Sequence, residues 1–268
     1  MIRTPLPAIV AVLITPALLV GPVTAQTWTQ VEDPEACGES RWNADWCEVR
    51  EVTLPAPDVL TVDGARSGGI HVTGEDRKDV LVRAKVLVWD VDGDEGRAVA
   101  DRIEISTDGR IFAHGPSPGE GASWAVSYEL HVPRESDLDL EALNGGVSIE
   151  GVEGEIEFAT RNGGVHLDDL AGRVRGETRN GGVSVELTGK TWRGAGLDVE
   201  TRNGGVHLVL PDDYSAELET GTVNGKVVSD IPVVRESRRS RRVSTSLGEG
   251  GPTVRVLTTN GGVRIRQT

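Results

Sequence analysis

Thr160-Arg-Asn-Gly-Gly-Val-His-Leu167 is followed by two close copies of itself, Thr178-Arg-Asn-Gly-Gly-Val-Ser-Val185 and Thr201-Arg-Asn-Gly-Gly-Val-His-Leu208. Asn-Gly recurs elsewhere in the C-terminal half, with spacings of 18, 18, 23, 21 and 36 residues between Asn144, Asn162, Asn180, Asn203, Asn224 and Asn260. A near-constant period is typical of proteins in which each repeat stacks on the next.

Apolar residues and threonines alternate with polar residues on both sides of each Asn. This period of two predicts two short strands that meet at an Asn-Gly corner. A series of β-hairpins would also use Asn-Gly turns, but it need not repeat one residue type at the same offset. We therefore expect an all-β, single-chain β-solenoid (β-helix) with rungs of roughly 18 residues. This prediction requires that the side chains of four residues stack in one buried file, namely Val147, Val165, Val183 and Val206.

The Asn and Gly residues at the corners can be explained by the backbone conformations that they allow. Glycine adopts positive φ without steric cost, and asparagine tolerates that region better than most residues. Stacked asparagines can also form a ladder of amide hydrogen bonds. We interpret the six asparagines as a structural corner ladder, the alternative being a row that binds a ligand.

The solenoid is expected to span residues 53–268, with regular Asn-Gly-Gly rungs over 136–268 and weaker punctuation before them. The last spacing fits either two rungs or one rung with an insertion. Because residues 235–251 are charged and rich in Ser and Gly, we interpret them as an inserted Arg-rich loop. Arg264 and Arg266 then lie on the final, open strand, where charge disfavours edge pairing. Residues 94–101 fit a short helix.

The N-terminal segment has the features of an export signal. A charged Arg3, an apolar run from Leu6 to Val20 and a small-residue site at Ala25 predict a signal peptide over residues 1–25, the alternative being a retained anchor. Residues 26–52 are expected to cap the solenoid, because an open end must be covered. Cys37 and Cys47, the only cysteines, favour a disulfide in an oxidising compartment.

The composition excludes some classes of partner. The formal net charge is −14, which argues against nucleic acid as a partner. Export places the protein in the periplasm, on the cell surface or in the medium. Surface glycan, anionic lipid or another envelope protein are the candidate partners, and the oligomeric state is open.

Several of these motifs together resemble a known family. The lead Cys47-Glu-Val-Arg-Glu-Val-Thr-Leu54, the repeated Asn-Gly-Gly-Val and the closing segment Leu247 to Ile265 are similar to the bacterial "putative adhesin" family with β-strand repeats, a domain of unknown function. The resemblance covers residues 47–268. It implies a right-handed β-helix in the cell envelope, and no catalytic residues come with it.

Acidic and histidine-containing patterns give weak candidate sites. Asp90, Asp92 and Asp94 match part of a calcium loop, but Glu95 and Asp101 stand where an EF-hand has Gly and Glu. A solvated acidic turn explains them equally. Two further columns are expected on outer faces, the first with serine and histidine and the second with carboxylates: His166, Ser184 and His207; Glu150, Asp168 and Glu186.

Two arginine clusters suggest anion recognition. Arg161, Arg179 and Arg202 form a column beside the corners, for which ion pairs with Glu177 and Glu200 compete with recognition of an anionic glycan or peptide carboxylate. A second cluster in the inserted loop is a candidate for an anionic partner, or simply a solvated loop: Arg235, Arg238, Arg239, Arg241 and Arg242.

We expect a non-enzymatic adhesin or envelope scaffold, with no catalytic residues, no cofactor and no metal. The alternatives are a polysaccharide-active enzyme on a β-helix, which would use paired carboxylates in a cleft, and a partner-binding module in envelope signalling.

Overall fold

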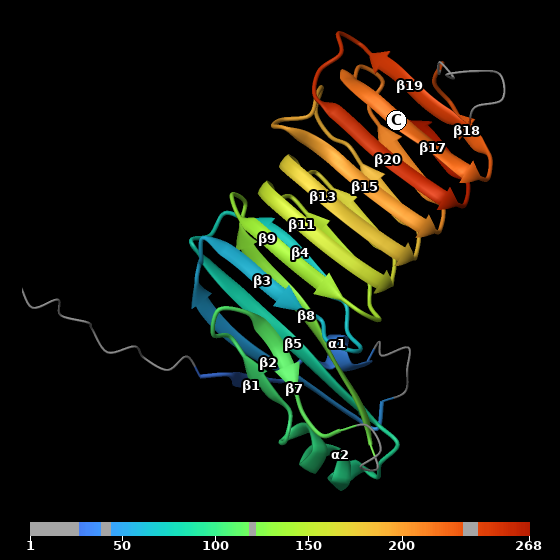
Figure 1. The fold of residues 1–268 in the computed structure, drawn as a ribbon. Helices are drawn as coiled ribbons and strands as arrows, with labels where there is room; N and C mark the ends of the chain where they lie inside the picture. Colours follow the sequence, from blue (N-terminus) through green and yellow to red (C-terminus); the bar gives the residue numbers. More distant parts are fainter. Residues whose placement is uncertain (1–26, 39–43, 118–121, 233–240) are drawn as a thin grey trace, which may run out of the picture.

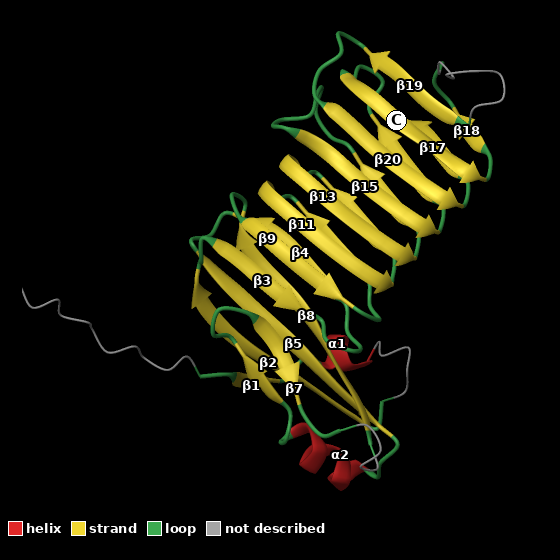
Figure 2. Ribbon diagram, in the orientation of Figure 1, coloured by secondary structure: helices red, strands yellow, loops and turns green. Residues whose placement is uncertain are grey.

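Each Asn-Gly-Gly corner joins a strand of one sheet to a strand of a second sheet, and the chain winds through both sheets coil after coil (Figure 1). The computed structural model describes residues 27–38, 44–117, 122–232 and 241–268. Strands dominate this part of the chain, with two short helices, α1 (Pro34–Gly38) and α2 (Gly93–Ala100) (Figure 2). The all-β, solenoid-like architecture expected from the repeats is confirmed.

Sheet A, with 11 strands, contains the strands that follow the corners. Its spatial order is β1 (Thr29–Val31), β2 (Trp46–Pro55), β5 (Asp79–Trp89), β8 (Ser123–Pro133), β4 (Ile70–Glu75), β10 (Val147–Glu150), β12 (Val165–Asp168), β14 (Val183–Glu186), β16 (Val206–Leu210), β21 (Val263–Gln267) and β18 (Val227–Ser229).

Sheet B, with 10 strands, contains the strands that lead into the corners. Its spatial order is β19 (Arg242–Leu247), β17 (Ala216–Asn224), β20 (Thr253–Asn260), β15 (Gly196–Asn203), β13 (Ala171–Asn180), β11 (Glu153–Asn162), β9 (Asp137–Ala142), β3 (Val59–Asp63), β7 (Ile111–His114) and β6 (Glu104–Ser106).

Successive coils pair in parallel and in register. Val147 pairs with Val165, Val165 with Val183, and Val183 with Val206. All four side chains are at most 3% exposed, so they form the predicted buried file. The interior between the two sheets is filled mainly by Val, Leu and Ile, which suits a narrow space between stacked strands.

A column of buried threonines also holds neighbouring coils together. Thr160 Oγ1 donates a hydrogen bond to the Gly145 carbonyl at 2.8 Å, and Thr178 Oγ1 donates to the Gly163 carbonyl at 2.9 Å. The same bond recurs in two further coils. Because each hydroxyl is buried, this bond avoids the cost of an unsatisfied polar group and ties each coil to the one before it.

Glycine is needed at the corners because the backbones of neighbouring coils approach each other closely there. The expectation that these glycines have positive φ was wrong. Within the described residues, none of the glycines that follow a corner Asn has positive φ. A Cβ at Gly163 would instead lie 1.9 Å from the Gly145 carbonyl oxygen, and one at Gly181 would lie 1.8 Å from the Gly163 oxygen. The first glycine of every corner therefore has no room for a side chain.

The second corner position is less restricted. A Cβ at Gly164 would lie 3.6 Å from the Gly182 carbonyl oxygen, which is ordinary contact. Lys226 occupies this position in the coil of β17 and β18, which is the last coil at its end of sheet A. No further coil of sheet A stacks beyond it there, so its side chain has space.

The coils do not follow chain order at the C-terminal end. Strand β20 lies between β15 and β17, and β21 lies between β16 and β18. The C-terminal coil is thus inserted between two earlier ones, and β18, not the strand with Arg264 and Arg266, is the edge of sheet A. The physical reason is that a repeat carries the same apolar pattern in every coil, so the pattern does not encode which coils are neighbours.

The segment expected to be an inserted loop is partly a strand. Within residues 235–251, β19 pairs antiparallel with β17 and covers the end of sheet B. The alternation of Val243 with polar neighbours is too short to stand out from the surrounding Ser and Arg residues. Residues 233–240 lie outside the described part of the chain.

The N-terminal half forms parallel coils only in part. The prediction that the solenoid runs through residues 53–135 was therefore wrong for part of this range. The coil of β3 and β4 lies between β7–β8 and β9–β10. Strand β5 runs antiparallel to both β2 and β8 and extends sheet A beyond the parallel coils. Residues 46–55 thus belong to the sheet as β2, and β1 forms its outer edge.

The remaining N-terminal features match the expectations. Cys37 and Cys47 form a disulfide, which joins α1 to β2. Helix α2 overlaps the short helix expected over 94–101. Residues 1–26, with the predicted signal segment, lie outside the described part of the chain.

The two corner glycines give a matched test of the stacking constraint. Gly163→Ala forces a Cβ against a backbone oxygen, so we expect it to lower the free energy of unfolding by about 3 kcal/mol. Gly164→Ala, the adjacent control, should stay within about 1 kcal/mol of the wild type. Urea unfolding followed by circular dichroism measures both. Equal losses for the two variants would show that close approach at the first glycine is not the constraint.

Candidate functional site

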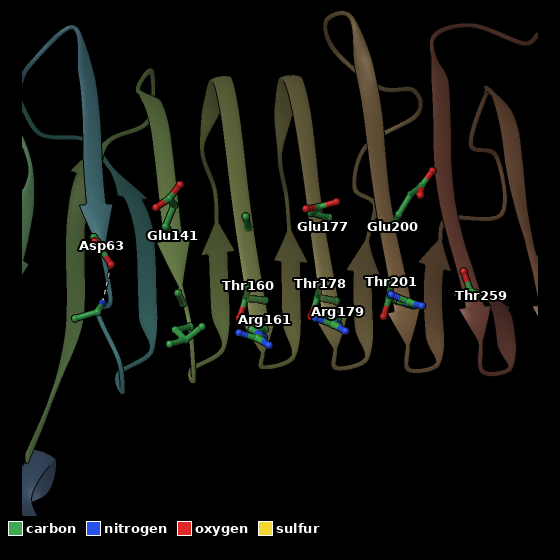
Figure 3. A pocket seen from close by; sticks show the side chains of 15 residues that line it. Asp63, Glu141, Thr160, Arg161, Glu177, Thr178, Arg179, Glu200, Thr201 and Thr259 are labelled. Carbon is green, nitrogen blue, oxygen red and sulfur yellow. Dashed lines mark hydrogen bonds between the residues drawn. The ribbon is translucent and has the colours of Figure 1, made fainter. Parts of the chain in front are cut away.

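Three arginines form a row on the outer face of sheet B. Arg161, Arg179 and Arg202 each precede a corner Asn, and those asparagines are paired in register. All three arginines are exposed. Neighbouring strands lie about 4.8 Å apart, so the guanidinium groups repeat along the stack at about that interval. Figure 3 shows Arg161 and Arg179 side by side on neighbouring strands.

The ion pairs expected for this row are absent. In the described part of the chain, no ion pair or hydrogen bond joins the three arginines to Glu177 or Glu200. Glu200 instead binds Arg255, which also binds Asp198. Partial burial lowers the pKa of the Arg255 guanidinium, but its bonds to Glu200 and Asp198 outweigh this and raise the pKa overall.

A parallel row of carboxylates accompanies the arginines. Glu141, Glu177 and Glu200 lie two residues before the arginine positions of their strands, and Figure 3 shows them as a second line along the stack. The two rows and the threonines between them line a groove of about 690 Å³. The surface therefore offers cations along one side and hydrogen-bond acceptors along the other.

The groove has defined ends and a defined floor. Leu143 and Thr259 take the place of the arginine in the coils on either side of the row. Ala159 lies between Glu141 and Glu177 and leaves a gap in the carboxylate row. The floor threonines already donate their hydroxyl protons to corner carbonyls, so the charged rows supply the groups available to a ligand.

The corner asparagines lie beside the arginine row and form a continuous ladder. Asn162 Nδ2 donates to Asn144 Oδ1 at 2.7 Å, and Asn180 Nδ2 donates to Asn162 Oδ1 at 2.7 Å. The ladder continues through Asn203 and Asn260, and it ends at Asn224. It thus follows the spatial order of the coils and not the chain order. Its bonds fix the corner beside which each arginine stands.

The outer face of sheet A carries the column of histidine and serine. Ser148, His166, Ser184 and His207 are paired across four adjacent strands. Within the described residues, no hydrogen bond joins a serine hydroxyl of this column to a histidine ring, and His207 Nε2 is a buried atom without a partner. A groove of about 570 Å³ passes over Ser148 and His166 toward α1. The column lacks the serine-to-histidine contact that a nucleophile needs.

The acidic column does not form a cleft with either groove. Glu150, Asp168 and Glu186 are neighbours in register on sheet A. Glu150 and Glu186 are exposed, and none of the three lines the two grooves described above. Paired carboxylates for sugar hydrolysis would need to flank a bound chain in a cleft.

The calcium candidate is not assembled. Among the residues that the structure describes, no group of three or more His, Cys, Asp or Glu side chains has a geometry that could hold a metal ion. Asp90 has a φ of 67°, and Asp92 is the N-cap residue of α2. Asp90 and Asp92 therefore lie in the turn that leads into the helix, and Asp94 lies in the first turn of the helix.

Only part of the second arginine cluster can be placed. Arg235, Arg238 and Arg239 lie outside the described residues. Arg241 donates to the Val223 carbonyl at 2.7 Å, and Arg242 begins β19. These two are therefore held against the end of β17, and the cluster remains a prediction from the sequence.

Sequence reasoning identified the arginine column but not the groove around it. The signal was the triplet Thr-Arg-Asn, which is identical in three coils. Asp63 and Ala65 also line the groove, from the coil before the first Asn-Gly corner. They were missed because that coil has Ser67-Gly68-Gly69 in place of Asn-Gly-Gly, so the strand before its corner could not be aligned on an Asn.

Comparisons with known proteins place the fold. Residues 118–266 match the model of the family described as Toastrack DUF4097, which is more than half of the chain. This match confirms the resemblance found in the sequence. No curated protein matches the chain. Within the described residues, no helix has the length and apolar character needed to cross a membrane.

Solved structures show distant similarity only. A "putative cell adhesion protein" from Clostridium sporogenes is 12% identical with a TM-score of 0.42, and the match covers 83% of this chain and 99% of that one. A "putative adhesin" from Bacteroides fragilis is 11% identical with a TM-score of 0.32, covering 82% and 97%. A "putative lipid binding protein" from Parabacteroides distasonis is 10% identical with a TM-score of 0.29, covering 82% and 96%. These values carry no argument about function.

Because no described residue forms an ion pair with the arginine row, loss of one of its charges should have little effect on the free energy of unfolding. Arg179→Gln removes the middle of three like charges, so we expect the free energy of unfolding to stay within about 0.5 kcal/mol of the wild type or to rise. Arg255→Gln, the matched control, loses ion pairs and should cost up to about 1 kcal/mol. Urea unfolding at low and high salt measures both. A larger loss for Arg179→Gln than for Arg255→Gln would mean that the row stabilises the fold.

Proposed function

The chain belongs to the Toastrack DUF4097 family, and we propose that it is a non-enzymatic binding protein of the cell envelope that attaches to a repetitive polymer. The family is one of unknown function, so the proposal depends on the surface of this chain. The observation that carries it is the row formed by Arg161, Arg179 and Arg202. These side chains repeat at the interval of the coils, they are exposed, and no ion pair with a described residue neutralises them.

A repeated ligand suits such a row better than a single small molecule. The groove is an open surface along several coils, and three successive coils each offer an exposed arginine. A polymer can place one unit against each coil, so that several weak contacts act together. Attachment of this kind needs no chemical step, and it supports a role as an adhesin or scaffold.

The location belongs to the same proposal. A disulfide between Cys37 and Cys47 favours an oxidising compartment. The sequence before residue 26 has the pattern of a signal peptide. We therefore propose export to the periplasm, the cell surface or the medium. We also propose that the solenoid is right-handed, as the resemblance to the "putative adhesin" family implies.

The proposal is tested by binding and by product analysis together. The chain from residue 26 onward should bind at least one member of a panel of acidic and neutral polysaccharides in biolayer interferometry. It should release no reducing ends from that polymer during a long incubation. Release of new reducing ends would identify a polysaccharide-active enzyme instead. Failure to bind any polysaccharide, with binding only to an envelope protein, would favour the signalling module.

A further inference from the structure

We propose that the groove on sheet B binds a linear polysaccharide of uronic acids, with its sugar units laid along the stack of coils. This inference rests on the proposed function and names the class of polymer. The arginine row receives the carboxylates, and Glu177 of the parallel glutamate row accepts hydrogen bonds from hydroxyl groups of the same chain.

The first step is the uncompensated charge of the row. Like charges directly opposite each other on neighbouring strands destabilise a sheet. This chain has 42 acidic residues, so carboxylates to pair with the arginines are plentiful. Arg83 shows what pairing looks like here, because it binds Asp33, Glu51 and Glu129. The row beside the corners lacks such partners within the described structure, which leaves its charge available to an anionic ligand.

The second step is the spacing of that charge. The arginines repeat at about 4.8 Å along the stack, whereas a single small anion would engage only one or two of them. A pyranose ring advances a polysaccharide by a similar distance. One sugar unit therefore spans about one coil, and the three arginines extend over the length of about three acidic sugars.

The third step is the glutamate row, which selects among polyanions. Glu177 makes no ion pair within the described residues, and it lies two residues from Arg179 on the same face of β13. That separation is about 6.5 Å along a strand. A polyphosphate has only acceptors, so Glu177 would repel it. A uronic acid carries hydroxyl donors as well as its carboxylate, and it can satisfy both rows at once.

The ends of the row limit the footprint. Leu143, which is 37% exposed, and Thr259 replace the arginine at the two ends. Neither provides a cation. Affinity should therefore rise steeply up to three acidic sugars and then change little, because further units find no further arginine.

Titration calorimetry with galacturonic acid oligomers of two, three, four and six units tests this footprint. Polygalacturonate binding by biolayer interferometry at low and high salt tests the charge dependence. The chain from residue 26 onward is used throughout. We expect measurable binding from three units upward and a decrease with salt. Binding that rises steadily with every added unit would contradict the three-arginine footprint.

The variants separate the arginine row from the charge of the whole face. Arg161→Gln, Arg179→Gln and Arg202→Gln combined should weaken polygalacturonate binding at least tenfold. Arg173→Gln, which alters a paired arginine on the same sheet outside the groove, should change it less than twofold. An unchanged thermal unfolding midpoint shows that the triple variant is folded. Undiminished binding by a folded triple variant would overturn the proposal.

Glu177→Gln distinguishes recognition of a sugar from attraction of any polyanion. If the carboxylate accepts sugar hydroxyls, this variant should weaken polygalacturonate binding and strengthen binding of polyphosphate. Stronger binding of both polymers would show general electrostatic attraction and overturn the proposal. Arginine-dependent binding to vesicles with anionic lipid, but not to polygalacturonate, would also overturn it. Binding to another polysaccharide alone would refute the uronic acid while leaving the proposed function in place.

Discussion

Close contact between the backbones of successive corners is the constraint on which the structure depends. The first glycine of each Asn-Gly corner lies so near a carbonyl oxygen of the adjacent coil that a Cβ would overlap it. This contact fixes both the height and the register of each coil. The buried threonines and the asparagine amides then bond across the same short distance, so they reinforce a spacing that the glycines permit. The lack of a side chain at the first glycine thus permits two sets of hydrogen bonds between neighbouring coils, those of the threonines and those of the asparagines.

The same register determines the chemistry of the surface. Once Thr178 lies over Thr160 in the interior, Arg179 must lie over Arg161 on the outside, because alternate residues of a strand point to opposite faces. An exposed row of like charges is therefore a direct result of repetition in the core. The strands beneath the row fix the point at which each arginine side chain leaves the backbone. Other arginines of the chain, such as Arg83 and Arg255, are held by carboxylates instead.

Much of the fold could be predicted from the sequence because its main contacts join equivalent residues. The corner columns, the buried valine file and the disulfide all follow from a repeat or from a pair of residues. The order of the coils could not be predicted, since every coil presents the same apolar pattern to its neighbours. The packing of particular side chains could not be predicted either. A Cβ at Gly176 would lie 2.2 Å from ring atoms of Phe158, so the large ring fills the space left by the glycine of the next coil. The alignment of the repeats shows the two residue types but not this contact. The arginine column was visible, but the pairing of Glu200 with Arg255 was not, because Arg255 is distant in sequence and adjacent only through the inserted coil.

The inserted coil has a consequence for how the molecule is made. Strands β17 and β18 are synthesised before β20 and β21, yet they rest upon them. While the chain emerges from the ribosome with its N-terminus first, β17 and β18 lack their parallel partners until the final residues arrive. Assembly of this end therefore waits for the complete polypeptide. A molecule cut short before residue 253 would lack the final coil and also the parallel partners of β17 and β18.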